Sequence, residues 1–331
     1  TRHFFSYGYT DSDGFDETDA AAQTARQLCP NASHDVLKVR AAPDPDEIGT
    51  MLAGQEEPVS TPSVLATFRM YRHMHAKGFR VALTGEGSDE LFAGYTRRYL
   101  PALARDSLRQ GRLGRAARLF SSPSLGSIAL AKRLVWDLPR PLLETLLARQ
   151  AAGVIAPAFR ETMRYRLEEE IRLRRDPLTT VLRRDVTRDL LPMIQRYADR
   201  NGMAASMEVR SPFLDHRLVA LALALPLHRK IGPAGGKLIL REAFAGILPD
   251  RVTHTPKRLG MGHAEQFNAA ALPLAALLDS PPPQAERYID LARLRDCLKA
   301  TPNEPMLWRP INLLLFLHGL HRQKRDAMPH G

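Results

Sequence analysis

The chain has 331 residues and a net charge of +11. Its length fits one large domain or two, and its apolar fraction of 44% is ample for a packed core. The longest uninterrupted apolar run, Leu218 to Leu227, is too short to cross a bilayer, so no membrane partner is expected. The two cysteines, Cys29 and Cys297, lie far apart, which excludes a disulfide scaffold or a thiolate zinc site and fits a reducing cytoplasm.

The first 95 residues alternate predicted strands and helices. They are strands at 3–9, 34–39 and 79–83, and helices at 16–28, 46–53 and 61–78. Strands separated by helices of this length predict a parallel, doubly wound sheet, which binds ligands beyond the carboxyl ends of its strands. Because the chain starts on a strand, without Met or a signal-peptide pattern, we expect a fragment or processed piece of a longer protein.

The third strand runs into a turn with two glycines, Thr84-Gly-Glu-Gly-Ser88. Glycine tolerates positive φ and close approach of a ligand, and exposed amides on such a turn suit phosphate. Glu86, Asp89 and Glu90 lie within five residues, and crowded carboxylates need a cation, a basic partner or solvent. Amides for phosphate beside carboxylates for Mg²⁺ are what ATP chemistry needs. A glycine turn followed by an acidic helix start is the alternative interpretation.

Residues 96–200 are predicted to form an all-helical, locally variable region, in which prolines break Leu- and Arg-rich helical patterns. The segment 97–175 carries 17 Lys or Arg against 7 Asp or Glu, and so holds nearly all of the excess charge. Arginines at helical spacing in it are Arg105, Arg109, Arg112, Arg115 and Arg118. We interpret them as a solvated helix face and expect no nucleic-acid partner, because no aromatic residues are interleaved to stack bases.

Residues 201–331 return to a dense helical pattern. Asp215 is predicted to cap a helix that runs to about Leu225 and is apolar nearly all round, so we expect that helix to be buried. A closing amphipathic helix is predicted at 307–320.

We interpret several charged residues between 199 and 241 as structural ion pairs or surface charges. We favour an ion-pair network beneath a site for Asp199, Glu208, Arg210 and Asp215. Within it, Glu208 and Arg210 lie in a Met- and Phe-rich stretch and are predicted to form a partly buried pair. Lys237 and Arg241 share a helix face at i and i+4, a spacing that fits surface solvation as well as phosphate contact.

Four stretches, in order, resemble the asparagine synthase family of the glutamine-hydrolysing type. The most specific is Leu83-Thr-Gly-Glu-Gly-Ser-Asp-Glu-Leu-Phe-Ala-Gly-Tyr95. The others are Phe4-Phe-Ser-Tyr-Gly8 with Asp16-Glu17, then Asn201-Gly-Met-Ala-Ala-Ser-Met-Glu-Val-Arg-Ser-Pro-Phe-Leu-Asp-His216, then Lys237-Leu-Ile-Leu-Arg241 followed by Pro256-Lys257. The resemblance covers most of the chain and is weakest between about 100 and 190.

The resemblance implies an α/β fold with a doubly wound parallel sheet of the adenine nucleotide alpha hydrolase-like (PP-loop ATP pyrophosphatase) type, followed by a largely helical region. It implies one synthetase domain over 1–331. Within this domain, 1–95 is the α/β nucleotide-binding part, 96–200 the helical variable region, and 201–331 a helical part that completes the active site.

The resemblance also implies a cytoplasmic ligase that uses ATP and Mg²⁺. In the family, a carboxylate, most often that of aspartate, is adenylated with release of pyrophosphate. Ammonia derived from glutamine then attacks the acyl carbon and gives an amide, here asparagine. The glutaminase domain normally lies on the same chain, and a homodimer is a possible assembly.

The family's functional residues carry over position by position. The resemblance assigns nucleotide contacts to Tyr7, Thr84, Gly85, Gly87 and Ser88. Glu86 matches the residue implicated in intermediate formation and ammonia attack, and Lys257 matches the lysine that meets phosphate, so both are predicted to be catalytic. Asp89 matches a carboxylate of the Mg²⁺–pyrophosphate site.

Two departures from the family pattern affect these expectations. The family's Ser-Gly-Gly-x-Asp-Ser pyrophosphate loop should precede Phe4, as should the glutaminase domain, and we expect a fragment that lacks both and is inactive alone. The segment 55–63 lacks an arginine that some asparagine-forming members use to stabilise the reacting phosphorus.

The alternatives to an asparagine-forming enzyme are a β-lactam or lasso-peptide cyclase, an amidase of surface sugars, or a degenerate non-catalytic scaffold.

Overall fold

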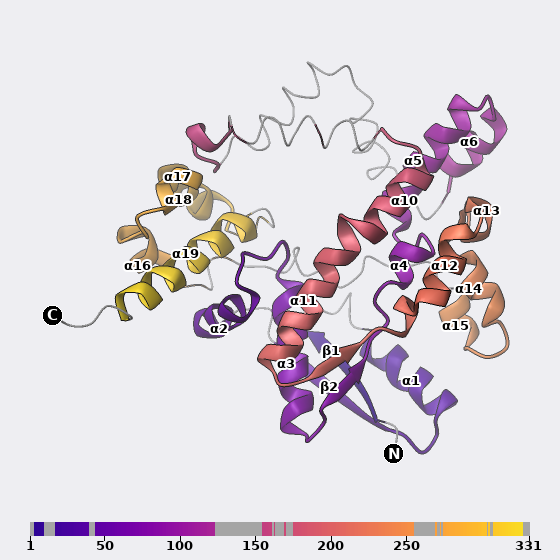
Figure 1. Ribbon diagram of the computed structural model, residues 1–331, viewed down its shortest axis with the longest axis horizontal. Coiled ribbons are helices and arrows are strands. Elements are labelled where there is room, and N and C mark those ends of the chain that lie inside the picture. The colour runs from indigo at the N-terminus through magenta and orange to yellow at the C-terminus, as the bar shows by residue number, and fades with distance from the viewer. Residues whose placement is uncertain are drawn as a thin grey trace.

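The structure is a computed structural model in which helices dominate a mixed α/β arrangement (Figure 1). It describes residues 3–9, 17–39, 44–122, 154–160, 162, 169, 175–254, 269, 272, 274–302, 304 and 307–326. The helix α11 (Leu190–Ala204) runs through the middle of the molecule in this view. None of the helices in the described part is both long and apolar enough to cross a membrane.

The N-terminal part alternates strands and helices, as its sequence predicts. In chain order the elements are β1 (His3–Tyr9), α1 (Thr18–Leu28), β2 (Ser33–Val39), α2 (Pro45–Gln55), α3 (Ser63–Ala76) and β3 (Val81–Leu83). β1 pairs with β2 in parallel, and β3 pairs in parallel with the distant strand β4 (Glu208–Arg210). The predicted parallel pairing of strands is therefore confirmed.

Local chemistry sets the helix boundaries close to their predicted positions. The Asp44 side chain accepts a hydrogen bond from the Asp46 amide at 3.0 Å and caps α2, whose first residue is Pro45. Helix α3 ends just before Gly78, whose φ of +89° is the left-handed conformation that glycine supplies at helix ends. Sequence-local signals are enough to fix these boundaries.

The predicted doubly wound sheet is not found within the described residues. β1–β2 and β3–β4 are separate two-stranded sheets there. The two sheets share one apolar cluster, in which Tyr7, Leu37, Ala82 and Val209 pack with Met70 of α3. Alternation of strands and helices predicts parallel strands, but which strand edges meet depends on the assembled fold, which the local pattern does not specify.

The described part of 96–200 is helical, as predicted, and consists of α5 (Thr96–Arg109), α6 (Leu113–Phe120), α10 (Leu178–Thr187) and α11. The predicted arginines do not share one helix, because α5 ends at Arg109 and α6 begins at Leu113, but Arg109, Arg112 and Arg118 are exposed, as predicted. Arg109, Arg112 and Arg115 line a hollow of about 470 Å³, together with residues of α10 and of the segment near His228.

The C-terminal part consists of short helices and one small hairpin. In chain order it contains the 3₁₀ helix η2 (Pro212–Leu214), α12 (His216–Ala224), α13 (Leu227–Lys230), β5 (Ile231–Gly232), β6 (Gly235–Gly236), α14 (Leu238–Ala243), α15 (Asp250–Thr253), α16 (Leu274–Asp279), α17 (Ala285–Tyr288), α18 (Leu291–Ala300) and α19 (Trp308–Asp326). Trp308 and Asn312 tie α19 to the segment after α2, through hydrogen bonds of 3.1 and 2.7 Å to the Val59 carbonyl and amide. The predicted closing helix is therefore confirmed.

Helix α12 is capped as predicted, but it is not buried as predicted. Asp215 caps it as predicted, because its carboxylate accepts a hydrogen bond from the Arg217 amide at 3.0 Å. The helix is not buried, however, since Leu221 is 56% exposed, Leu223 is 40% exposed, and Ala222 is its buried residue. An apolar sequence gives a helix the capacity to be buried, whereas actual burial requires neighbouring elements that only the tertiary structure places.

Candidate active site

The glycine turn lies at the carboxyl end of β3, held against the end of β4. The Thr84 amide donates to the Arg210 carbonyl at 2.9 Å, and the Thr84 hydroxyl is hydrogen-bonded to that of Ser211 at 3.1 Å. A Cβ built on Gly85 meets no atom within 4 Å, so the turn faces open space there. The carboxyl end of a parallel strand is the position at which α/β folds bind ligands.

Gly87 makes the sharp bend that follows. Its φ is +88°, and a Cβ at this position would overlap the side chain of Leu214. Both constraints require glycine. The next residue, Ser88, is buried as the first residue of α4 (Ser88–Leu91), and its hydroxyl donates to the Gly85 carbonyl at 2.9 Å. The turn therefore closes on itself and holds Glu86 at its tip.

Glu86 lies in an environment that favours its protonated form. Burial raises the pKa of Glu86 from its ordinary value of 4.5 to about 7, the hydrogen bond from Gln195 opposes this shift, and the charge of Glu90 adds to it. Gln195 of α11 donates to the Glu86 carboxylate at 3.0 Å. A carboxylate that titrates near neutral pH can both accept and return a proton, which is the property of a general acid–base group.

Asp89 faces a lysine that lies 148 positions later in the sequence. The Lys237 ammonium is 3.0 Å from Asp89 Oδ1 and donates to the Ser88 hydroxyl at 2.9 Å. Both partners of the ion pair are shielded, with side-chain exposures of 27% for Lys237 and 21% for Asp89. Asp89 is thus held by a cation, and it does more than start the short helix α4.

Two glycines permit this contact. A Cβ on Gly94 would overlap Asp89 Oδ1 and would lie 2.5 Å from Lys237 Cε, while a Cβ on Gly236 would overlap the Ala93 carbonyl oxygen. The Lys237 amide also donates to the Phe92 carbonyl at 2.9 Å. The hairpin β5–β6 and the segment after α4 therefore approach as closely as two backbones without side chains allow.

Hydrogen bonds among residues that follow the turn hold its helix α4 in place. Glu90 is buried and accepts a hydrogen bond from the Tyr95 hydroxyl at 2.7 Å. Burial, together with the charge of Glu90, raises the pKa of Tyr95, so its phenol stays protonated and donates. The rings of Tyr95 and Tyr99 lie 6.1 Å apart, and the Tyr99 hydroxyl donates to the buried Asp185 at 2.9 Å.

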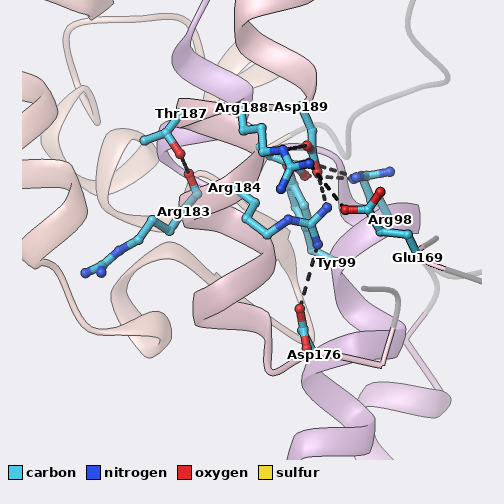
Figure 2. Close-up of polar contacts among 10 residues, drawn as sticks. Arg98, Tyr99, Glu169, Asp176, Arg183, Arg184, Thr187, Arg188 and Asp189 are labelled. Carbon is cyan, nitrogen blue, oxygen red and sulfur yellow. Dashed lines mark hydrogen bonds and ion pairs between the residues drawn. The ribbon is translucent and has the colours of Figure 1, made fainter. Parts of the chain in front are cut away.

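Asp185 anchors α5 to α10 through a bidentate ion pair. Arg98 donates to its two carboxylate oxygens at 2.7 and 2.8 Å. Figure 2 shows Arg98 and Tyr99 beside a neighbouring group of charges, in which Arg184 contacts Asp176 and Asp189, and Arg188 contacts Glu169 and Asp189. The bidentate pair is the strongest form of this contact, and it fixes the helices on which the turn rests.

The structure brings together most of the predicted site residues, leaves Tyr7 untested and does not describe Lys257. Those that form the turn are Thr84, Gly85, Glu86, Gly87, Ser88 and Asp89. Tyr7 lies on β1, partly buried in the cluster that also contains Ala82 of β3, so its predicted adenine contact stays a prediction. Lys257 falls outside the described residues, and its role also stays a prediction.

The predicted ion-pair network beneath the site is wrong, because its members form separate, exposed pairs. Glu208 and Arg210 pair at 2.8 Å, but their side chains are 55% and 61% exposed, so the pair is not partly buried. Asp215 pairs instead with Arg217 at 2.8 Å. Because exposed ion pairs stabilise a fold by less than about 1 kcal/mol, these contacts contribute little to the site.

Sequence reasoning missed Gln195 and Ser211 as neighbours of the turn, and left Lys237 undecided between solvent and phosphate. Lys237 turns towards Ser88, whereas its supposed partner on the helix face, Arg241, donates to the carbonyls of Gly236 and Thr253. No pattern in the sequence signals Gln195, whereas Ser211 lies in the stretch Asn201 to His216 that carries the family resemblance. For Lys237 the preceding pair of glycines was the available signal, because it marks a close backbone approach.

The turn fits a nucleotide that brings its own metal ion. No group of three or more His, Cys, Asp or Glu side chains within the described residues could hold a metal. Mg²⁺ in nucleotide sites commonly uses one or two carboxylates and completes its coordination with phosphates and water. Asp89 could supply one such carboxylate, so the turn suits that arrangement better than a permanent metal site.

Comparison with known proteins agrees with these features. The chain matches the family model described as asparagine synthase over residues 1–319. A putative asparagine synthetase (glutamine-hydrolyzing) of Mycobacterium tuberculosis strain H37Rv is 30% identical over 286 residues, which cover 76% of this chain and 40% of the relative. Asparagine synthetase (glutamine-hydrolyzing) 1 of Bacillus subtilis strain 168 is 25% identical over 279 residues, 77% of this chain and 41% of the relative.

A differently named relative matches at similar identity. Amidase chyE of Penicillium rubens is 26% identical over 294 residues, which cover 78% of this chain and 43% of the relative. This chain therefore spans about two-fifths of the length of the curated relatives that it matches.

Proposed function

The chain belongs to the asparagine synthase family, and we propose that it carries out ATP-dependent amide formation. In this proposal a carboxylate, with aspartate as the first candidate, is adenylated with release of pyrophosphate. Ammonia derived from glutamine then attacks the acyl carbon of the adenylate, AMP leaves with the former carboxylate oxygen, and the product is an amide, asparagine when the substrate is aspartate. Mg²⁺ accompanies the nucleotide.

The observation that carries the proposal is the combination of Glu86 and Asp89 on one rigid turn. Glu86 has a pKa near 7, and the largely shielded Asp89 lies 3.0 Å from a lysine ammonium. Adenylation and amide formation need a group that moves a proton and a group that holds Mg²⁺ with phosphate. A turn that served only to start a helix would not require either arrangement.

Each residue has a defined part in this scheme. When bound, ATP supplies the phosphoryl chemistry that makes a carboxylate oxygen a leaving group. Thr84, Gly85 and Gly87 shape the turn on which the nucleotide rests, Asp89 holds Mg²⁺, and Glu86 accepts the proton that ammonia loses as it attacks. Lys257 offsets phosphate charge, a role taken from the family resemblance.

In this proposal each of the three parts of the chain contributes differently to the active site. Residues 1–95 supply the turn and, through Tyr7, a contact to the adenine. Residues 96–200 form the helical support, which includes the Arg98–Asp185 pair beneath the turn. Residues 201–331 complete the site from the other side, as the Lys237 contact illustrates.

A second candidate is the same chemistry on another carboxylate. The segment 55–63 carries no arginine, and its two acidic residues, Glu56 and Glu57, form ion pairs with Arg200 and Arg196 of α11. The relative named as an amidase is nearly as similar to this chain as one of the asparagine synthetases. This candidate covers amidation of a larger acid and cyclisation within one substrate.

Pyrophosphate release tests both candidates. The test uses the full-length protein that contains these residues, because the fragment alone is expected to be inactive. This protein is incubated with ATP, Mg²⁺ and ammonium or glutamine, and pyrophosphate is measured with aspartate and with a panel of other carboxylic acids. Release with aspartate, together with formation of asparagine, supports the first candidate, whereas release with another acid alone supports the second. A protein that binds ATP but releases no pyrophosphate with any acid would contradict the proposed function.

A further inference from the structure

A hollow of about 470 Å³ lies where the C-terminal end of α5, the turn into α6, the N-terminal end of α10 and the short helix α13 meet (Figure 1). Three arginines line it, Arg109, Arg112 and Arg115. Cavities of this size accommodate small organic molecules. The hollow is therefore large enough for a ligand that carries both a charged group and an organic part.

The turn that presents these arginines has a well-defined backbone. The Gln110 amide donates to the Asp106 carbonyl at 3.1 Å, and the Arg112 amide donates to the Ser107 carbonyl at 2.8 Å. The buried Asp106 carboxylate accepts a hydrogen bond from the Leu178 amide at 2.7 Å and so fastens the end of α5 to the start of α10. Two walls of the hollow are thereby held at a fixed separation.

The three arginines of the hollow have no acidic partner in the part of the chain that the structure describes. None of them forms an ion pair with a described carboxylate, and Arg109 donates to the backbone carbonyl of Arg175 at 3.0 Å. Arg98 of α5 and Arg184 of α10, by contrast, each contact a carboxylate (Figure 2). The positive charge of the hollow is thus left to solvent or to a ligand.

The charge of the lining matches that of a dianion. Three arginines against one aspartate, Asp106, leave an excess of two positive charges among the described residues of the lining. A phosphate monoester carries a charge of about −1.5 to −2 at pH 7. The planar guanidinium group also fits phosphate oxygens with two parallel hydrogen bonds. A phosphate ester therefore suits the hollow in both charge and geometry.

The neutral part of the lining indicates which kind of ester fits. Gln110 and Thr179 supply polar side chains there, beside the apolar side chains of Leu103 and Leu227. Sugar hydroxyl groups can exchange hydrogen bonds with the polar pair, while the carbon atoms of the sugar contact the leucines. No aromatic side chain is among the described residues of the lining, so it does not suit the stacked bases of a nucleic acid.

The hollow is separate from the glycine turn. Arg98, whose pair with Asp185 fixes the helices on which the turn rests, and Arg109 lie near opposite ends of α5, so about 16 Å of helix separates them. On α10, likewise, Thr179 lines the hollow near the N-terminal end, whereas Asp185 lies further along the helix. A ligand in the hollow does not occupy the position that we assign to the nucleotide.

We propose that this hollow is a second ligand site, which binds a sugar phosphate. The phosphate contacts the three arginines of the hollow, and the sugar lies against Gln110, Thr179 and the two leucines. The inference goes beyond the proposed function and does not depend on it, because no residue of the glycine turn takes part.

The test measures binding of glucose 6-phosphate by calorimetry to the full-length protein that contains these residues. Arg112→Gln and Arg115→Gln each remove one charge and keep a polar side chain. Each is expected to weaken the affinity for glucose 6-phosphate about tenfold to a hundredfold, the range for loss of a charge-assisted hydrogen bond. Glucose, which lacks the phosphate, and inorganic phosphate and succinate, which lack the sugar, are expected to bind more weakly to the wild type.

Arg118→Gln is the matched control. Arg118 also lies on α6 and is exposed, but its guanidinium donates to the Gly114 carbonyl at 3.4 Å and it does not line the hollow. The substitution removes the same charge from the same helix. It therefore separates a contact inside the hollow from a general effect of surface charge, and its affinity for glucose 6-phosphate is expected to stay close to that of the wild type.

Three results would overturn the inference. An equal loss of affinity in Arg112→Gln, Arg115→Gln and Arg118→Gln would show a general basic surface that attracts any anion. Succinate that binds as tightly as glucose 6-phosphate would remove the assignment to a sugar phosphate. Unchanged affinity in both hollow variants, or a wild type that binds no glucose 6-phosphate at millimolar concentration, would show that the hollow is not the site. All three leave the proposed function intact, which pyrophosphate release tests separately.

Discussion

Replacing Glu86 with Gln should change how the stability of the protein depends on pH. Burial raises the pKa of Glu86 from 4.5 to about 7, so between these values the folded state binds a proton that the unfolded state has released. The free energy of unfolding then falls as pH rises through this window. A shift of this size corresponds to about 3 kcal/mol, of which about 2 kcal/mol develops between about pH 5 and pH 8.

Urea denaturation of the wild type and Glu86→Gln at several pH values in this range measures the effect. Because other titrating groups are common to both proteins, the difference between their unfolding free energies isolates Glu86. The variant is expected to gain about 2 kcal/mol relative to the wild type from about pH 5 to pH 8. Its rate of amide formation is expected to fall about 10²-fold or more, as for loss of a positioned acid–base group.

The exposed carboxylate Glu208 provides the control, because Glu208→Gln removes the charge of a side chain that is 55% exposed and paired at the surface. This variant should follow the wild-type pH dependence. A Glu86→Gln protein whose stability also runs parallel to that of the wild type from about pH 5 to pH 8 would refute the argument that burial holds the proton on Glu86.

Three further variants test neighbouring contacts. Asp89→Asn should raise the Mg²⁺ concentration needed for half-maximal pyrophosphate release, and an unchanged Mg²⁺ titration with a lower melting temperature would support a purely structural role. Asp185→Asn should destabilise the fold by about 3 kcal/mol in urea denaturation, because it leaves the partly buried Arg98 without its charge partner; a loss below about 1 kcal/mol would place the pair among ordinary surface contacts. Gly94→Ala should weaken ATP binding in calorimetry, because its Cβ would overlap Asp89 and crowd Lys237; wild-type affinity would show that the close approach is not needed.

Local sequence signals predicted much of the fold. The cap at Asp215, the helix end at Gly78 and the strands before and after α1 all lie where the sequence places them. Each of these features depends on contacts between residues a few positions apart, so a single stretch contains the information. The glycine turn was found in the same way, since Gly85 and Gly87 are its own signal.

The features that complete the site come from contacts across long stretches of the chain. Gln195 reaches Glu86 over 109 positions and Lys237 reaches Ser88 over 149. The exposure of Leu221 on an apolar helix, and the separation of the strands into two small sheets, are likewise settled by which elements become neighbours. A sequence pattern specifies the character of each element, whereas its partners follow from the packing of all elements together, and so the pKa of Glu86 and the partner of Asp89 were decided only by the tertiary structure.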